Sequence, residues 1–216
     1  MKSKLTTLLL ILLGIAYGRS QGFINLNFEN ATFVTHPFGS PAVYSANAIQ
    51  GWIPYLDNSA QDYVASNGAS LGGAQINIEG TNNPFGYLAV QGKYFILLQG
   101  GSFAGHSSGL GQTEQIPITT QSILFWGALF GGAQVLFNGN PLSFAVTGTT
   151  PNNYNIYQAD ISAYAGQTGE LLFFTPFNTS AIIDNIQFSS TAVPEPSALA
   201  LTAIGAAWLG FRRWKK

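Results

Sequence analysis

The nine acidic residues of this 216-residue chain are scattered, so few of them could act together. A glycosidase needs two carboxylates that face each other across a sugar ring. Asp57 and Asp62 are the nearest candidates, but both fall in a predicted loop, where we expect them to be solvated. The sequence therefore favours a protein that is not an enzyme, with a hydrolase of unrecognised type as the less favoured alternative.

Two histidines and one serine are the other candidates for acid–base or nucleophilic chemistry. His36 and His106 lie in predicted loops, with no acidic residue clustered around either one in the sequence. Residues 105–109 match the Gly-x-Ser-x-Gly pattern around Ser107, but no helix is predicted after them, as a nucleophile elbow requires. The stretch around it, residues 100–111, is rich in glycine but lacks the lysine and helix of a phosphate loop. We expect a long flexible loop there, and no metal or acid–base role for the histidines.

Aromatic side chains offer a different chemistry, because ring faces pack on the apolar faces of sugars while amides bond to sugar hydroxyls. Trp126 lies in the middle of a predicted strand and is expected in the core. Trp52 and Tyr55 are the best ligand-binding candidates, although either could belong to the core instead. The aromatic residues in or near predicted loops are Tyr44, Trp52, Tyr55, Tyr87, Tyr94 and Tyr154.

The charge distribution narrows the range of partners. Between Gln21 and Pro194 the chain has eight acidic residues and one basic residue, Lys93, which gives a net charge of −7. Such a segment cannot neutralise phosphates, so nucleic acid is excluded as a partner, whereas cations and uncharged polymers are compatible. The absence of cysteine excludes disulfides, zinc–thiolate sites and cysteine nucleophiles.

Residues 21–190 show the pattern of an all-β domain. Short apolar or alternating runs are separated by Gly, Asn, Pro and Ser, and only residues 160–169 could form a single helical turn. Asn138-Gly139 suits a type I′ hairpin turn, and Pro141 places the returning strand near a sheet edge. We therefore expect an antiparallel β-sandwich. The predicted strands are residues 23–28, 74–80, 86–91, 94–100, 122–130, 133–139, 142–148, 170–177 and 181–189.

The first 18 residues have the three parts of a secretory signal peptide. Lys2 and Lys4 precede an apolar run that ends at Ala16, and small residues follow. Cleavage is expected after Gly18, with Ser20 as the alternative. A buried N-terminal helix is the competing interpretation. The apolar run is too short for a lasting membrane anchor.

Residues 191–216 combine a proline-rich stretch, an uncharged segment over residues 197–211 and a basic end. Pro194-Glu195-Pro196, the apolar helix and the Arg212-Arg213 cluster, in this order, resemble the PEP-CTERM sorting signal. The resemblance covers residues 193–216 and implies an exosortase-type membrane peptidase as a partner. It further implies a transmembrane sorting helix that is in the inner membrane only in transit, with its C-terminus in the cytoplasm. The final destination would be the bacterial cell surface or extracellular matrix.

The layout of the central domain is similar to that of jelly-roll carbohydrate-binding modules with galactose-binding-like folds. The residues that carry this likeness are the "LNFEN" and "GW" segments near the start and "IIDNIQFS" near the end. In those modules an acid from the first strand and one from the last bind a structural calcium, a pattern that Glu29 and Asp184 match. Hard cations prefer oxygen ligands, which suits an acidic, Asn-rich domain. Alternatively, each acid only accepts hydrogen bonds from neighbouring amides.

Together these features predict a jelly-roll-like β-sandwich between a signal peptide and a sorting helix. The expected function is non-catalytic binding of extracellular polysaccharide by an exported protein. The alternative is a structural or adhesive matrix component without a defined ligand. Structural calcium is the only cofactor that the sequence suggests.

Overall fold

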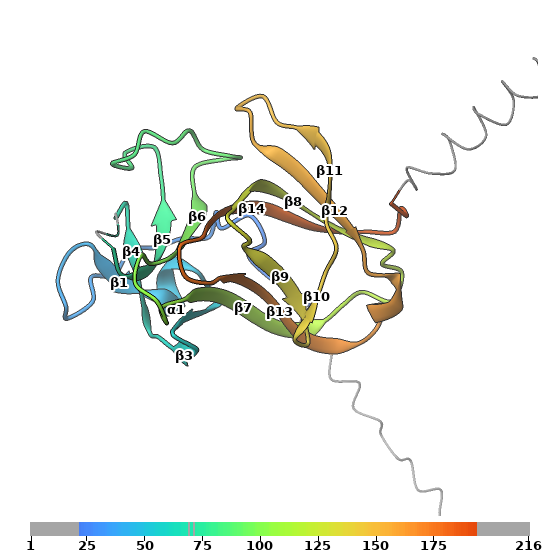
Figure 1. The fold of residues 1–216 in the computed structure, drawn as a ribbon, viewed down its shortest axis with the longest axis horizontal. Coiled ribbons are helices and arrows are strands. Elements are labelled where there is room, and N and C mark those ends of the chain that lie inside the picture. The colour runs from blue at the N-terminus through green and yellow to red at the C-terminus, as the bar shows by residue number, and fades with distance from the viewer. Residues whose placement is uncertain (1–21, 69, 71, 194–216) are drawn as a thin grey trace, which may run out of the picture.

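The computed structural model describes residues 22–68, 70 and 72–193, and almost all of its regular structure is strand. The strands form two sheets that lie as two layers, one above the other in Figure 1. This arrangement confirms the expected all-β, sandwich-like fold. The short helical elements are α1 (Ser45–Ala48) and the one-turn 3-10 helix η1 (Ser162–Tyr164), the latter inside the stretch predicted to form a single turn.

The larger sheet has eight strands in the order β1-β4-β5-β6-β14-β8-β12-β11. Its neighbours are antiparallel except for β4 and β5, which run parallel. Its strands are β1 (Ala42–Tyr44), β4 (Tyr63–Ser66), β5 (Ala74–Glu79), β6 (Phe95–Gly100), β8 (Ser122–Phe130), β11 (Ala145–Thr149), β12 (Asn155–Asp160) and β14 (Ser180–Ser189).

The smaller sheet has six strands in the order β10-β9-β13-β7-β2-β3, all antiparallel. Asn138 and Gly139 link β9 to β10 with φ of 49° and 76°, as a type I′ turn requires, and Pro141 lies in the edge strand β10. The hairpin prediction is confirmed. The strands are β2 (Ile53–Leu56), β3 (Ser59–Ala60), β7 (Ser108–Gln115), β9 (Gln134–Phe137), β10 (Asn140–Pro141) and β13 (Thr168–Thr175).

The main core lies between the two sheets. Alternate residues of each strand point inward, so Ile96 and Leu98 of β6 meet Leu171 and Phe173 of β13 in one buried cluster. Aromatic rings fill its centre, with Phe125 at 5.3 Å from Phe173 between ring centroids. Because these residues face the core, the residues next to them in each strand point outward.

The centre of the outer face of the eight-stranded sheet is also buried. Residues 80–94, the connection from β5 to β6 that we call the cover, fold over it beside the β11–β12 hairpin (Figure 1). Tyr154 Oη donates to the Leu88 carbonyl at 2.9 Å and thereby ties the hairpin to the cover. A second apolar cluster forms beneath them. Its buried members are Val90, Phe95, Leu97 and Ile182, with Trp126, Ala128 and Tyr154 packed against it.

Two predicted strands are not strands. Residues 23–28 are irregular and turn structure, because Asn25 and Phe28 have φ of 49° and 56°, in the left-handed region. Residues 86–91 belong to the cover instead of a sheet. Conversely, the glycine-rich stretch predicted as a long loop ends in β7, which begins at Ser108 and pairs with β13 and β2. That prediction was wrong for its last four residues, 108–111.

The predicted signal peptide (1–18) and the sorting residues Pro194, Glu195, Pro196, Arg212 and Arg213 lie outside the described residues. In the part of the chain that the structure describes, no helix has the length and apolar character needed to cross a membrane.

Candidate functional site

The outer face of the six-stranded sheet carries a groove with Gly109 of β7 in its floor, and Gly111 follows it beneath Tyr55 and Glu170. Leu110 of β7 is fully buried in the core, so its neighbours Gly109 and Gly111 occupy outward positions and place no side chain there. Tyr55 of β2 lies opposite Gly109 on one side, and Phe174 of β13 lies opposite it on the other. A strip of bare backbone therefore runs between two aromatic residues.

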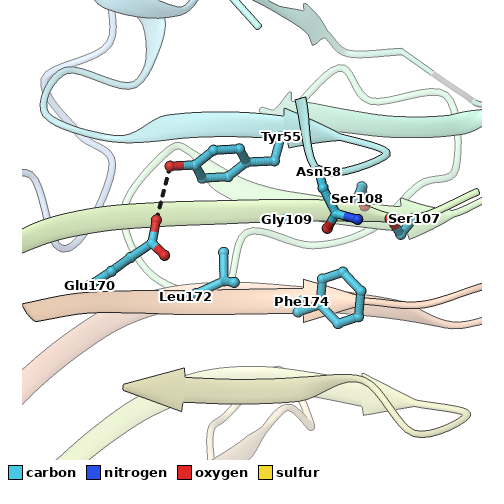
Figure 2. A pocket seen from close by; sticks show the side chains of 8 residues that line it. All are labelled: Tyr55, Asn58, Ser107, Ser108, Gly109, Glu170, Leu172 and Phe174. Carbon is cyan, nitrogen blue, oxygen red and sulfur yellow. Dashed lines mark hydrogen bonds between the residues drawn. The ribbon is translucent and has the colours of Figure 1, made fainter. Parts of the chain in front are cut away.

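The pocket at this position has a volume of about 200 Å³. Figure 2 shows Tyr55 reaching along β7 toward Glu170, while Leu172 and Phe174 follow one another along β13. Most of these side chains are partly exposed, so a ligand could reach them from solvent. The lining residues are Tyr55, Asn58, Ser107, Ser108, Gly109, Glu170, Leu172 and Phe174.

The two floor glycines are required by the side chains beside them. A Cβ atom on Gly111 would lie 2.5 Å from Glu170 Oε1 and 3.0 Å from Tyr55 Cε2. A Cβ atom on Gly109 would lie 3.2 Å from Leu172 Cδ1. Alanine at 111 would therefore displace Glu170 or Tyr55, because contacts under 3 Å cannot be accommodated without movement.

A hydrogen bond fixes Tyr55 across the groove. Its Oη donates to Glu170 Oε1 at 2.9 Å. Burial first, and then the hydrogen bond to Glu170 and its negative charge, together raise the pKa of Tyr55 to about 12. Tyr55 thus stays a protonated donor whose ring has one orientation, which suits a preformed binding surface.

A second pair of polar side chains marks the other end of the pocket. Asp57 Oδ2 contacts His106 Nδ1 at 2.8 Å, and Asp57 Oδ1 accepts the Ser107 backbone N–H at 2.8 Å. The Ser107 N–H first and His106 second hold the pKa of Asp57 below its usual range. These contacts join the turn after β2 to the connection before β7, and so shape the pocket rim.

Sequence reasoning missed the acidic partners of both histidines. His36 Nε2 lies 3.3 Å from Asp62 Oδ1, just as His106 pairs with Asp57. The paired residues are 26 and 49 positions apart, so no local spacing could reveal them. His36 is buried among the rings of Phe38, Tyr44 and Tyr63 and serves packing.

Of the two predicted ligand-binding aromatics, only Tyr55 lines the pocket. Trp52 is 4% exposed and packs against Phe28 and Phe173 in the main core. Its Nε1 donates to the Asn25 carbonyl at 3.1 Å, so its one polar atom is satisfied internally. Contrary to the expectation from sequence, Trp52 has no exposed ring face to offer a ligand.

The structure brings Glu29 and Asp184 to the same part of the cover. Glu29 Oε1 accepts the backbone N–H groups of Lys93 and Tyr94 at 2.7 and 3.0 Å. Asp184, on β14, is fully buried, and its Oδ2 accepts the Gln91 N–H at 2.8 Å. Burial raises the pKa of Asp184 to about 8 in spite of the hydrogen bonds from the Asn185 and Gln91 N–H groups, which lower it, and the charge of Glu29 makes a smaller contribution in the direction of burial.

Part of this arrangement would suit a calcium ion. The side-chain oxygen of Gln91 is buried and accepts no hydrogen bond, and it comes from the residue whose N–H binds Asp184. A cation would satisfy that oxygen and relieve the repulsion between the two carboxylates. Among the described residues, however, no three His, Cys, Asp or Glu side chains group closely enough to hold a metal, so main-chain and amide oxygens would have to complete the coordination.

A scan against protein-family models, a search of curated proteins and a search of solved structures found no match for this chain. The function of the groove must therefore be inferred from its own geometry.

Proposed function

We propose that the central domain is a non-catalytic carbohydrate-binding module that takes a polysaccharide segment in the groove of the six-stranded sheet. The observation that supports this most is the glycine floor between Tyr55 and the Leu172–Phe174 wall. Sugar rings have apolar faces that pack on aromatic and aliphatic side chains, and hydroxyls at their edges that need polar partners. Glu170, Asn58 and Ser107 supply such partners around the groove.

The size of the groove favours a segment of a polymer. Pockets for drug-sized ligands have roughly 300–1,000 Å³ and enclose most of the ligand. At about 200 Å³, this pocket is smaller and takes one unit of a larger molecule. A polymer bound across the open sheet would gain affinity from several such weak contacts.

Replacing Gly111 with alanine tests the groove directly. The added methyl group would displace Glu170 or Tyr55 and obstruct the floor, so affinity should fall about tenfold or more, equivalent to about 1.4 kcal/mol. Binding is measured with the full-length protein on an array of neutral, amino-sugar and uronic-acid glycans, followed by titration calorimetry with the best ligand.

Gly73→Ala is the matched control. Nothing lies within 4 Å of a Cβ atom placed there, so this variant should bind like the wild type. Equal affinity for the Gly111 and Gly73 variants would remove the groove from the proposal. A wild-type protein that binds no glycan would instead favour a structural or adhesive matrix component without a defined ligand.

The jelly-roll-like character of the sandwich and a calcium ion at Glu29 and Asp184 are part of the same proposal. The ion would be structural: it would join β14 to the cover on the face opposite the groove. Its role would be to hold the cover in place and not to contact the sugar.

The two ends of the sequence support a proposal for the location of the domain. We propose export through the signal peptide, processing by an exosortase-type peptidase at Pro194-Glu195-Pro196, and release to the cell surface or matrix. An extracellular polysaccharide would be accessible there. Peptide mapping of the mature protein tests this: peptides covering Trp208 to Lys216 should be missing, and their recovery from surface protein would contradict the processing step.

A further inference from the structure

In the described part of the chain, the carboxylates around the groove have no lysine or arginine near them. Among the described residues the single lysine or arginine is Lys93, which lies in the cover on the outer face of the other sheet. The groove itself has Glu170 in its wall and Asp57 directly before Asn58 at its rim. A ligand in the groove would therefore meet negative charge without a neighbouring lysine or arginine to offset it.

Glu170 has unused capacity to accept hydrogen bonds. Its Oε1 accepts the Tyr55 hydroxyl, while its Oε2 makes no hydrogen bond with any described residue. The side chain is half-buried, so water screens its charge less than at a fully exposed position. Asp57, by contrast, already uses both oxygens on His106 and Ser107. Glu170 is thus the carboxylate that is available to a ligand.

We propose that the groove selects polysaccharides whose sugars carry a free, protonated amine, with glucosamine-type units as the chemical class. The amine would donate to Glu170 while the sugar face packs on Tyr55 or Leu172. Charge-assisted hydrogen bonds of this kind are about twice as strong as neutral ones. Uronic-acid polymers would be repelled by the same carboxylate. This inference rests on the proposed function and specifies its ligand class.

The β-1,4-linked tetramers of glucosamine, N-acetylglucosamine and glucose distinguish the effect of charge on affinity from the effect of shape. Titration calorimetry with the full-length protein at mildly acidic pH should give at least about tenfold tighter binding for the glucosamine tetramer. That preference should weaken as salt is added, because screening acts on the charge contribution alone.

Glu170→Gln keeps the size of the side chain and removes its charge, so the preference for the glucosamine tetramer over the glucose tetramer should fall to threefold or less. Asp160→Asn removes the same charge from the end of β12 in the other sheet and should leave the ratio unchanged. The ratio is the readout, so a general loss of affinity does not obscure the result.

Each of the other possible outcomes contradicts the amino-sugar inference. Equal binding of all three tetramers, or a preference that survives Glu170→Gln, overturns the amino-sugar inference and leaves glycan binding standing. Tighter binding of uronic-acid oligomers overturns it as well. If neither these tetramers nor any other glycan binds, the proposed function fails together with the inference.

Discussion

The two outer faces of the sandwich differ in how far their outward apolar side chains are covered by the rest of the chain. On the eight-stranded sheet, Phe95, Leu97 and Ile182 point outward and are buried by the cover and the β11–β12 hairpin. On the six-stranded sheet, Leu172 and Phe174 also point outward, yet the groove beside them is open. The outward apolar side chains at the centre of the larger sheet are buried by other parts of the chain, whereas those beside the groove stay partly exposed, as at a binding surface.

The difference shows which apolar residues to consider for function. Large side chains on the covered face have their hydrophobic partners within the domain, so burial explains them fully. Those on the open face pack incompletely, and Tyr55, Glu170 and Leu172 lie directly over Gly109 and Gly111, which have no side chain. Apolar residues that the fold leaves uncovered next to a bare backbone are therefore the better candidates for contacting a ligand.

The same substitution on each face gives the largest expected contrast. Phe95→Ala should reduce the free energy of unfolding by about 3–5 kcal/mol, because Phe95 is fully buried under the cover. Phe174→Ala should reduce it by about 1 kcal/mol or less, since its ring is partly exposed. Urea unfolding of both variants measures the difference. Similar losses for the two variants would show that the open face is packed as tightly as the covered one.

The sequence predicted the covered face better than the open one. Continuous apolar runs such as residues 94–100 indicate strands buried on both sides, and β6 is one of these. Strand β7 escaped detection because Gly109 and Gly111 read as loop residues and Leu110 is the one apolar residue in the strand, so no alternating apolar pattern marks it. The groove is built on this strand, so the pattern that forms the site also hid it.

The contacts that hold the site together were beyond local pattern analysis. Tyr55 and Glu170 are 115 positions apart, and only the pairing of β2 and β13 with β7 brings them together. Trp52 and Tyr55 are three positions apart, yet Trp52 lies in the core and Tyr55 on the surface. Assigning Trp52 to the core and Tyr55 to the surface required knowing that β2 begins at Ile53, and the sequence pattern does not indicate this boundary.

A buried acid under the cover predicts that stability falls as the pH rises toward neutrality, the opposite sign to that expected from Asp57 at the pocket rim, whose pKa is lowered. Glu79 lies beside Phe95 in register, is fully buried, and neither of its carboxyl oxygens has a hydrogen-bond partner among the described residues. Burial raises the pKa of Glu79 from 4.5 to about 7. Between these values the folded state holds a proton that the unfolded state has released, so stability falls as the pH rises.

Glu79→Gln should remove this loss, because the amide stays neutral. The wild type should lose up to about 3 kcal/mol between pH 4.5 and 7 from this residue, and the variant should be the more stable protein at pH 7. Urea unfolding at several pH values measures both. The explanation is wrong if the variant keeps the full wild-type slope over this window, or if stability rises with pH there.

Calcium at Glu29 and Asp184 would sharpen the contrast, since the covered face would then be held by an ion and the open face would remain free for the ligand. An ion that binds only the folded state at 100 times its Kd stabilises it by about 2.7 kcal/mol, so a chelator should lower the Tm of the full-length protein by about 5–10 °C. The effect should grow with pH, because burial raises the pKa of Asp184 to about 8 and calcium must displace its proton. Asp184→Asn should melt at the same temperature with and without chelator, whereas Glu170→Gln, on the open face, should keep the full sensitivity.

Should the wild-type melting curve not respond to chelator at any pH, the ion is discarded. Glu29 and Asp184 then stabilise the cover only by accepting the backbone N–H groups of residues 91, 93 and 94.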